Sequence, residues 1–296
     1  MDAEGHARPF KPHLDLANIL WSVSIQGEVV RLKSTLIDYS PQRGGKRGQV
    51  FDFSRSSRKR MLEMVSTIYW KKISHGLFIT LTCPEDCWPN DSKVRNRWRY
   101  LFFRSMEIYL GKKIGALWRV EWKKRKTGRN KGKVLPHFHL IVPNVKYVPK
   151  EVIGKFWKQA TGSNEQVIRD VQRLTDRRKH EVYIAKYAAK GAEVHRLDYV
   201  AYLNMAGRHW GVHRPTLIPR FLSRTYADLP YSTVKIIRDM GCKGLPWYDP
   251  AVDAGFVAFG RFGREIVDAV AKLCLDTGIE PTYDDANKGE SRPVPA

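Results

Sequence analysis

The chain has 296 residues, of which 43% are hydrophobic, so it is long enough for one large globular domain or for a core of about 150 residues with extensions. Its 52 Lys and Arg residues outnumber its 30 Asp and Glu residues and give a net charge of +22, which favours a polyanionic partner such as nucleic acid. The alternatives are an acidic membrane surface and a basic surface that serves solubility alone.

Three familiar sequence signals are missing. The chain does not open on a basic segment followed by an apolar run, and it has no apolar stretch of about 18 residues, so we expect neither a secretion signal nor a membrane span. The phosphate-loop pattern GxxxxGK[ST] is missing too, which leaves any unwinding of duplex DNA to another protein. The cysteines form no CxxC pair and are expected to be reduced thiols in the cytoplasm. They are Cys83, Cys87, Cys242 and Cys274.

The predicted elements follow one another along most of the chain. Residues 1–50 are expected to form a loosely organised arm, and residues 124–133 a loop rich in Lys, Arg and Gly. Elsewhere, apolar residues at helical or alternating spacing predict helices and strands. The helices are expected at 54–69, 91–110, 150–160, 178–190 and 257–275, and the strands at 77–82, 116–123, 134–142 and 166–174.

The order strand, helix, strand, strand, helix, strand is that of a ferredoxin-like or RRM-like βαββαβ core. We therefore predict an α+β fold with a central antiparallel sheet, helices on one face of it, and helical extensions at both ends. In this plan the first and third strands are central neighbours, and the second strand pairs with the third. The predicted domains are an N-terminal arm at 1–53, a central domain at 54–224, and a C-terminal helical extension and tail at 225–296.

Two histidines one residue apart occupy the third predicted strand. His137 and His139 point the same way because alternate residues of a strand share a face. Two imidazoles placed in this way can hold one metal ion. The alternative is that they are ordinary polar residues on the solvent side of the strand.

The second predicted strand supplies a candidate third ligand. Trp118 and Trp122 are expected to point inward, which leaves Arg119 and Glu121 on the polar face. Two imidazoles and one carboxylate would suit Mg²⁺ or Mn²⁺, which polarises the scissile phosphate during phosphoryl transfer. The alternative for Glu121 is an ion pair with Arg119 or with a neighbouring lysine.

Two tyrosines four residues apart share one face of the predicted helix at 178–190. Tyr183 and Tyr187 are each followed three residues later by a lysine, Lys186 and Lys190. A nearby ammonium group favours the phenolate and can neutralise a phosphate. Tyrosine attack on a phosphodiester conserves the bond energy in a protein–DNA ester. The alternative is that both tyrosines belong to the inner stripe of an amphipathic helix.

These motifs, in this order, resemble those of the HUH endonucleases, in particular the two-tyrosine replication initiators of rolling-circle plasmids and single-stranded DNA phages. Phe78-Ile79-Thr80-Leu81-Thr82 is similar to the first motif of the family, His137-Phe138-His139 to its metal-binding second motif, and Tyr183 to Lys190 to its catalytic third motif. The resemblance covers residues 54–215. The loop at 124–133 departs from the family pattern by its length and its six basic residues.

The resemblance implies a rolling-circle replication initiator, that is, a metal-dependent endonuclease and ligase that nicks one DNA strand. Tyr183 or Tyr187 would form the 5′-phosphotyrosine and free a 3′ hydroxyl. The ligands of Mg²⁺ or Mn²⁺ would be His137, His139 and Glu121. Lys190 and Lys186 would support the phosphate or the phenolate, and Thr80 and Thr82 would shape the floor of the site.

The implied partners are a single-stranded DNA origin, with a hairpin as one form of it, and the host helicase and polymerase, with no membrane. The implied location is the cytoplasm of a bacterial host, with a phage or plasmid as the carrier of the gene. For Trp210 the alternative role is to cover the sheet as core. The expected DNA contacts are Arg119, Lys124, Arg125, Lys126, Arg129, Arg208 and Trp210.

Two other functions fit the same residues. A transposase or mobilisation relaxase of the HUH type uses the same chemistry, and strand exchange between element ends would distinguish it. A non-catalytic module that binds single-stranded nucleic acid is the other, since a ferredoxin-like plan with a basic and aromatic surface also suits RNA recognition. Cys83, directly after the first motif, is expected to be a packing residue, with a redox-sensitive thiol as the alternative.

Overall fold

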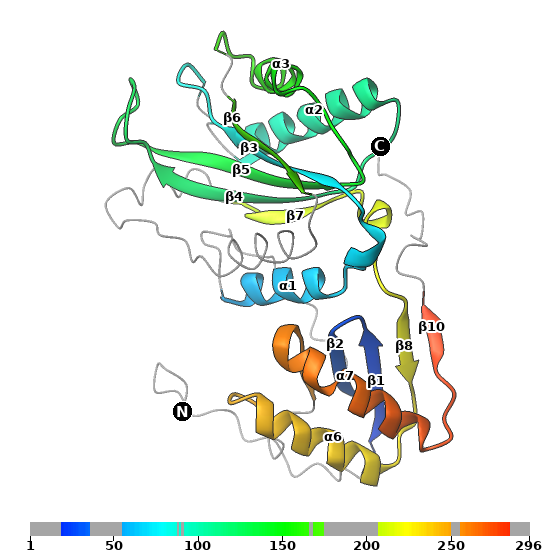
Figure 1. Ribbon diagram of the computed structural model, residues 1–296. Coiled ribbons are helices and arrows are strands. Elements are labelled where there is room, and N and C mark those ends of the chain that lie inside the picture. Colours follow the sequence, from blue (N-terminus) through cyan, green and yellow to red (C-terminus); the bar gives the residue numbers. More distant parts are fainter. Residues whose placement is uncertain are drawn as a thin grey trace. The chain divides into compact units, whose positions relative to one another are not determined.

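The computed structural model describes residues 19–35, 55–87, 89, 92–165, 168–174, 207–249 and 255–284 (Figure 1). The chain divides into two compact units. Residues 45–220, together with 286–296, form what we call the central unit, and residues 1–44 and 221–285 form the terminal unit. Among the described helices, none combines the length and the apolar character that crossing a membrane requires.

An antiparallel sheet of five strands, in the order β6-β3-β5-β4-β7, forms the middle of the central unit. The α+β class is thus confirmed, and the element ranges lie close to the predicted ones. Strand β7 was not predicted, and the predicted helix at 178–190 lies outside the described residues. In chain order the elements are β3 (Gly76–Thr82), α2 (Ser92–Leu110), β4 (Ala116–Lys124), β5 (Val134–Pro143), α3 (Lys150–Thr161), β6 (Ile168–Leu174) and β7 (Trp210–His213).

Helices α2 and α3 cover one face of this sheet (Figure 1). Trp118 and Trp122 of β4 belong to the buried cluster beneath these helices, as their alternation predicted, together with Phe102 of α2 and Trp157 of α3. Trp157 Nε1 also donates a hydrogen bond of 2.7 Å to the carbonyl of Thr82, at the end of β3. Helix α3 is therefore fixed to the sheet both by apolar packing and by a buried polar contact.

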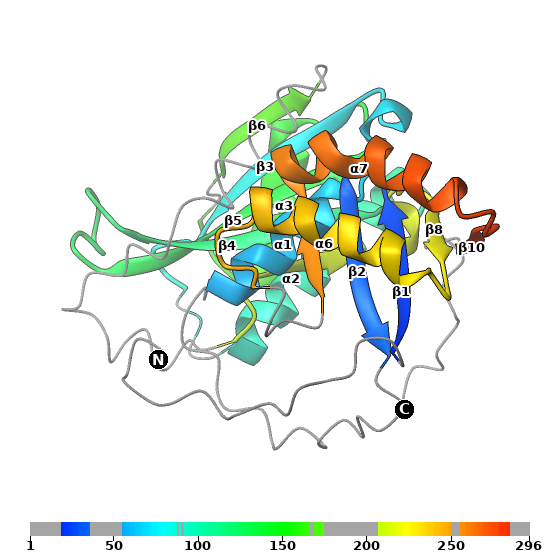
Figure 2. The same ribbon diagram turned by 90° about the horizontal axis from the view of Figure 1, so that it is seen from below.

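Helix α1 (Arg55–Ser66) and the short helix η2 (Trp70–Lys72) lie on the other face of the sheet (Figures 1 and 2). Phe78, Ile141 and Leu174 of the sheet form a second buried cluster with Met61 of α1 and with Ile218. Phe78 and Ile141 are ladder partners near the beginning of β3 and the end of β5. This face is therefore apolar at one end, while the histidines lie further along, at the other end of the same strands.

A second antiparallel sheet of five strands, in the order β10-β8-β1-β2-β9, forms the terminal unit. Trp21, Val23 and Ile25 alternate along β1 and pack in one buried cluster with Ile237 of α6 and Val270 of α7. The elements are β1 (Leu20–Gln26), β2 (Val29–Thr35), β8 (Ser223–Tyr226), α6 (Tyr231–Gly244), β9 (Phe256–Ala258), α7 (Gly260–Leu275) and β10 (Thr282–Asp284).

The terminal unit differs from the division of the chain that the sequence suggested. Residues 1–53 were expected to form an arm and residues 225–296 a separate helical extension, whereas strands from the two ends of the chain share one sheet. A lone hairpin is marginally stable in water, so β1 and β2 depend on partners that lie far away along the chain. Pairing over such a distance leaves no local signal in the sequence.

An ion cluster around Glu107 ties α2 to the segment that follows β7. Arg214 Nε and Nη2 donate to the two Glu107 carboxylate oxygens at 2.5 and 3.0 Å, and His213 Nε2 lies 3.2 Å from Oε1. The Ile114 amide donates to the same carboxylate at 3.2 Å. Burial raises the pKa of Glu107, but these hydrogen bonds and the charge of Arg214 lower it more strongly, to about 2.

We expect Glu107→Gln to lower the free energy of unfolding by about 2–3 kcal/mol at pH 7, because the carboxyl pKa falls from 4.5 to about 2 on folding. A pKa lowered by folding stabilises the protein above the unfolded pKa, and this stabilisation is lost as the pH falls towards 2. Thermal unfolding followed by circular dichroism at pH 7 and near pH 2 measures both effects. The control is Glu280→Gln, which removes an exposed carboxylate. A Tm at pH 7 equal to that of the wild type would contradict the expectation.

Candidate functional site

The two histidines of the HxH motif lie on β5, between β3 and β4. Phe138 and Leu140 of the same strand belong to the cluster beneath α2 and α3. His137 and His139 alternate with them and therefore lie on the opposite face of the sheet. The face that carries the histidines is set by the apolar residues on either side of them.

Two threonines of β3 hold the histidine rings from one side. Thr82 is the ladder partner of His137, and Thr80 is the ladder partner of His139. The distances from Thr82 Oγ1 to His137 Nδ1 and from Thr80 Oγ1 to His139 Nδ1 are both 3.2 Å. A hydrogen bond at Nδ1 fixes the orientation of an imidazole and leaves Nε2 for a metal. The threonines thus orient both rings, and neither is needed as a ligand.

Glu121 approaches the histidines from the other side, on β4. It is the ladder partner of His137, and its Oε2 atom lies 2.8 Å from His139 Nε2 and 3.9 Å from Lys123 Nζ. The ion pair with a neighbouring lysine is therefore present beside the histidine contact. Burial lowers the pKa of His139, and the hydrogen bond to Glu121 opposes this shift. The pKa of His139 is lowered overall, which favours the neutral imidazole, the form that binds metals.

The donor atoms of His137, His139 and Glu121 are of the types that bind a divalent cation. The three side chains, however, do not surround a single metal position. Among the described residues, no group of three or more His, Cys, Asp or Glu is placed to hold a metal ion. The 2.8 Å between His139 and Glu121 is close to the roughly 2.9 Å between neighbouring ligands of an octahedral Mg²⁺. His137 faces Glu121 across the ladder, where opposite Cβ atoms lie about 5 Å apart. His137 therefore lies on the same face as this pair, with its Nδ1 atom held by Thr82.

The predicted nucleophiles lie outside the described residues. Tyr183 and Tyr187, with Lys186 and Lys190, fall in the range 175–200. Their position relative to the histidines stays a prediction from the motif order and the helical spacing.

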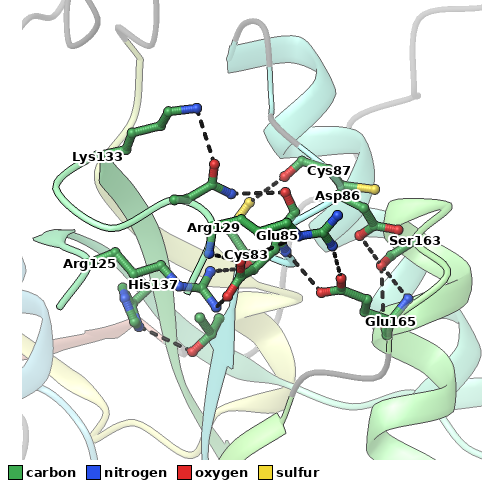
Figure 3. Close-up of polar contacts among 12 residues, drawn as sticks. Cys83, Glu85, Asp86, Cys87, Arg125, Arg129, Lys133, His137, Ser163 and Glu165 are labelled. Carbon is green, nitrogen blue, oxygen red and sulfur yellow. Dashed lines mark hydrogen bonds and ion pairs between the residues drawn. The ribbon is translucent and has the colours of Figure 1, made fainter. Parts of the chain in front are cut away.

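The basic loop between β4 and β5 is held by acidic residues at one end of the sheet (Figure 3). Arg125 Nη2 lies 2.8 Å from Glu85 Oε1, and Arg125 Nη1 donates to the carbonyl of Cys83 at 3.3 Å. Arg129 pairs with Glu85 and with Glu165. The Arg125 side chain is 10% exposed, so it serves the network and has little surface for DNA. The Arg129 side chain is 72% exposed and can still contact DNA from solvent.

The acidic side of this network carries no sequence motif. Glu85 and Asp86 follow β3, and Glu165 precedes β6. Ser163 Oγ donates to Asp86 Oδ1 at 2.5 Å, and the Asn164 amide donates to Oδ2 at 2.7 Å. Three loops are thus joined beside the candidate site, as Figure 3 shows. Each partner comes from a distant part of the chain, so no local pattern marks these residues.

The other predicted DNA contacts differ in their exposure. Arg119 is 4% exposed and is the ladder partner of His139. Trp210 Nε1 donates to Ser57 Oγ at 3.0 Å, and the ring packs against the cluster beneath α1, as the core alternative predicts. Three residues are exposed on the surface: Lys124, Lys126 and Arg208.

Comparison of the chain with protein-family models, with curated proteins and with solved structures gives no match. The resemblance to HUH endonucleases therefore rests on the three motifs and on the placement of the residues around the histidines.

Binding of Mn²⁺, measured by isothermal titration calorimetry, tests the metal site. Replacement of His137 or His139 by Ala is expected to weaken binding by roughly tenfold or more, and Thr82→Val by about tenfold, because an outer partner of a ligand His supports its affinity. His75→Ala is the control, since this histidine lies outside the site beside Ser74. Equal affinity in all of these proteins would rule out the assigned ligands.

Cys83 is placed as a packing residue. Its side chain is fully buried, and Sγ lies 3.0 Å from the carbonyl of Cys87. Burial raises the pKa of the thiol to about 12. Because the thiolate is the reactive form, this environment opposes the redox-sensitive alternative.

A thiol reagent such as Ellman's reagent is expected to modify the exposed Cys242 first in the folded protein. Cys83 and Cys274 are buried, and burial raises their pKa values to about 12 and about 11, so both should react only after unfolding. The Cys242→Ser variant should lose the fast phase. Rapid modification of Cys83 in the folded Cys242→Ser protein, located by peptide mass spectrometry, would show that the thiol is accessible.

Proposed function

We propose that the protein is a two-tyrosine HUH endonuclease that initiates rolling-circle replication by nicking one DNA strand. The observation that carries this proposal is the 2.8 Å contact between His139 and Glu121 on neighbouring strands. Thr80 and Thr82 hold the Nδ1 atoms of both histidines from the opposite side. Two ordinary surface histidines would need neither a half-buried carboxylate nor a matching pair of hydroxyl groups.

The topology of the central unit supports the same proposal. The strand order β6-β3-β5-β4, with α2 and α3 on one face, supports the ferredoxin-like βαββαβ plan as part of this proposal. In this plan β3 and β5 are central neighbours, so the first and second motifs lie side by side. Helices α2 and α3 occupy the other face, and α1 covers the apolar end of the face that carries the histidines. In this proposal the tyrosines and the DNA approach the histidine end of that face.

In the proposed reaction, a tyrosine oxygen attacks the scissile phosphodiester. Tyr183 or Tyr187 gives up its phenolic proton, and its oxygen forms the new bond to the phosphorus, which stays on the 5′ end of the downstream DNA. The bond from phosphorus to the 3′ oxygen breaks, and this oxygen takes up a proton to become the free 3′ hydroxyl. One phosphate ester replaces another, so the step is reversible. The second tyrosine can then cleave the next origin copy in the same way. The 3′ hydroxyl that it frees attacks the first phosphotyrosine, which closes the displaced strand into a circle and releases the first tyrosine.

The surrounding residues have supporting roles in this proposal. Lys190 and Lys186 stabilise the phenolate or the phosphate, and Arg119 adds a positive charge beside His139. Mg²⁺ or Mn²⁺, held by His137, His139 and Glu121, would supply Lewis-acid polarisation of the scissile phosphate.

The proposed substrate is a single-stranded DNA origin, in the open form or as a hairpin. The net charge of +22 supports a polyanionic partner. A host helicase and polymerase would provide unwinding and synthesis. The corresponding location is the cytoplasm of a bacterial host, with a phage or plasmid as the carrier of the gene.

Incubation with end-labelled single-stranded DNA of its own replicon and Mn²⁺, followed by denaturing electrophoresis, tests the proposal. We expect a covalent adduct that carries only the DNA downstream of the cut. The adduct should be lost with EDTA and in the Tyr183→Phe, Tyr187→Phe double variant, because both remove a required part of the chemistry. The two single variants identify the tyrosine that attacks first, and Tyr69→Phe, outside the motif, is the matched control.

The same experiment separates the alternative functions. Self-joining of two origin copies supports replication, whereas strand exchange between element ends indicates a transposase. Tight DNA binding that survives EDTA and both tyrosine substitutions, with no nick under any condition, would reject the nuclease in favour of a non-catalytic binding module.

A further inference from the structure

Arginine side chains stack on tryptophan rings between α2 and β4, in the buried layer on the face of the sheet opposite the histidines. The guanidinium carbon of Arg99 lies 3.5 Å from the ring centroid of Trp118, and that of Arg95 lies 5.2 Å from the ring of Trp122. The two arginines are one helical turn apart, and the two tryptophans lie four residues apart on the same face of the strand. With the exposed Arg208, we call these residues the arginine–tryptophan cluster.

The segment before β7 brings Arg208 to this cluster. Gly207 has a φ of +142° and lies against the start of α2, where a Cβ atom would come within 2.8 Å of Ser92 Cβ and 3.1 Å of Arg95 Nη2. Glycine is required here both by the backbone conformation and by the close approach. Burial and the charges of Arg95 and Arg208 lower the pKa of Arg99 to about 10.

The described surroundings of Arg99 contain positive charge without a matching carboxylate. Among the described residues, the charged groups that lower its pKa are Arg95 and Arg208. Its Nη1 atom is shielded from solvent and has no hydrogen-bond partner among the described residues. A charged N–H donor that is buried without a hydrogen-bond partner destabilises the fold. Stacking of the guanidinium on an indole ring offsets only part of this desolvation penalty. An anion would relieve both the repulsion and the missing hydrogen bond.

We infer that the arginine–tryptophan cluster is a second DNA contact, in which Arg99 and Arg208 bind a backbone phosphate of the strand. A guanidinium held flat against an indole presents its N–H edge in a fixed plane, which fits two oxygens of a phosphate. Arg99 is only half-buried and Arg208 is exposed, so a phosphate can approach from solvent. The choice of DNA rests on the proposed function, but the contact itself does not depend on nicking.

Fluorescence anisotropy with a labelled single-stranded oligonucleotide, in EDTA and at several salt concentrations, tests the inference without any cleavage. We expect Arg99→Gln to weaken binding by about tenfold and to reduce the slope of log affinity against log salt by roughly 0.7, as for one lost phosphate contact. Arg208→Gln should act in the same direction. The matched control is Arg97→Gln, which removes an exposed arginine from the same helix and should change binding by less than about twofold.

The outcomes are distinct from those of the cleavage assay. Normal affinity in Arg99→Gln and Arg208→Gln, or an equal loss in Arg97→Gln, would overturn the site even if the protein nicks DNA. Arg99→Gln is first checked by thermal unfolding, and if it does not fold, the exposed Arg208→Gln variant decides alone. Inorganic phosphate is then added at a concentration equal to that of the phosphate groups of the oligonucleotide. If it displaces the oligonucleotide from the wild type but not from Arg99→Gln, DNA is overturned as the ligand, and the site is assigned to a small phosphorylated molecule.

Discussion

The central unit depends on the alternation of side chains along β5, the middle strand of its five-stranded sheet. Phe138 and Leu140 are buried beneath α2 and α3. Because side chains alternate along a strand, His137 and His139 must lie on the opposite face. A slip of one residue would bury both imidazoles under the helices and expose the apolar pair. The same register sets Thr82 and Glu121 on either side of His137. The geometry of the candidate site is therefore a by-product of how the core is packed.

Carboxylates are outnumbered in this chain, and several of those that the structure describes each serve more than one cation. Glu107 contacts Arg214, His213 and Lys113, and Glu85 contacts both Arg125 and Arg129. Buried charges of this kind are tolerated when they are paired and hydrogen-bonded. Arg99 departs from this pattern within the described part of the chain, where the charged groups that lower its pKa are the arginines Arg95 and Arg208.

Local periodicity predicted the elements of the central sheet, the inward face of β4 and the shared face of the histidines, because each of these depends on residues close together in the chain. The face of Glu121 was predicted in the same way, but its contact with His139 needed the pairing of two strands. The network of Glu85 and Glu165, the strand β7 and the sheet of the terminal unit could not be predicted, since their partners are joined only by the folded chain. Trp210 was ambiguous because an aromatic residue beside basic ones suits both a DNA surface and a core.

The terminal unit is built from both ends of the chain, with the central unit inserted between its strands β2 and β8. This order has a consequence for synthesis on the ribosome. The hairpin of β1 and β2 emerges first, but the helix α7 that covers it is completed only at Leu275. At about 5–20 residues per second, the interval is roughly ten to fifty seconds. During that time the central unit can fold, while the apolar face of the hairpin is still without the helix α7 that covers it.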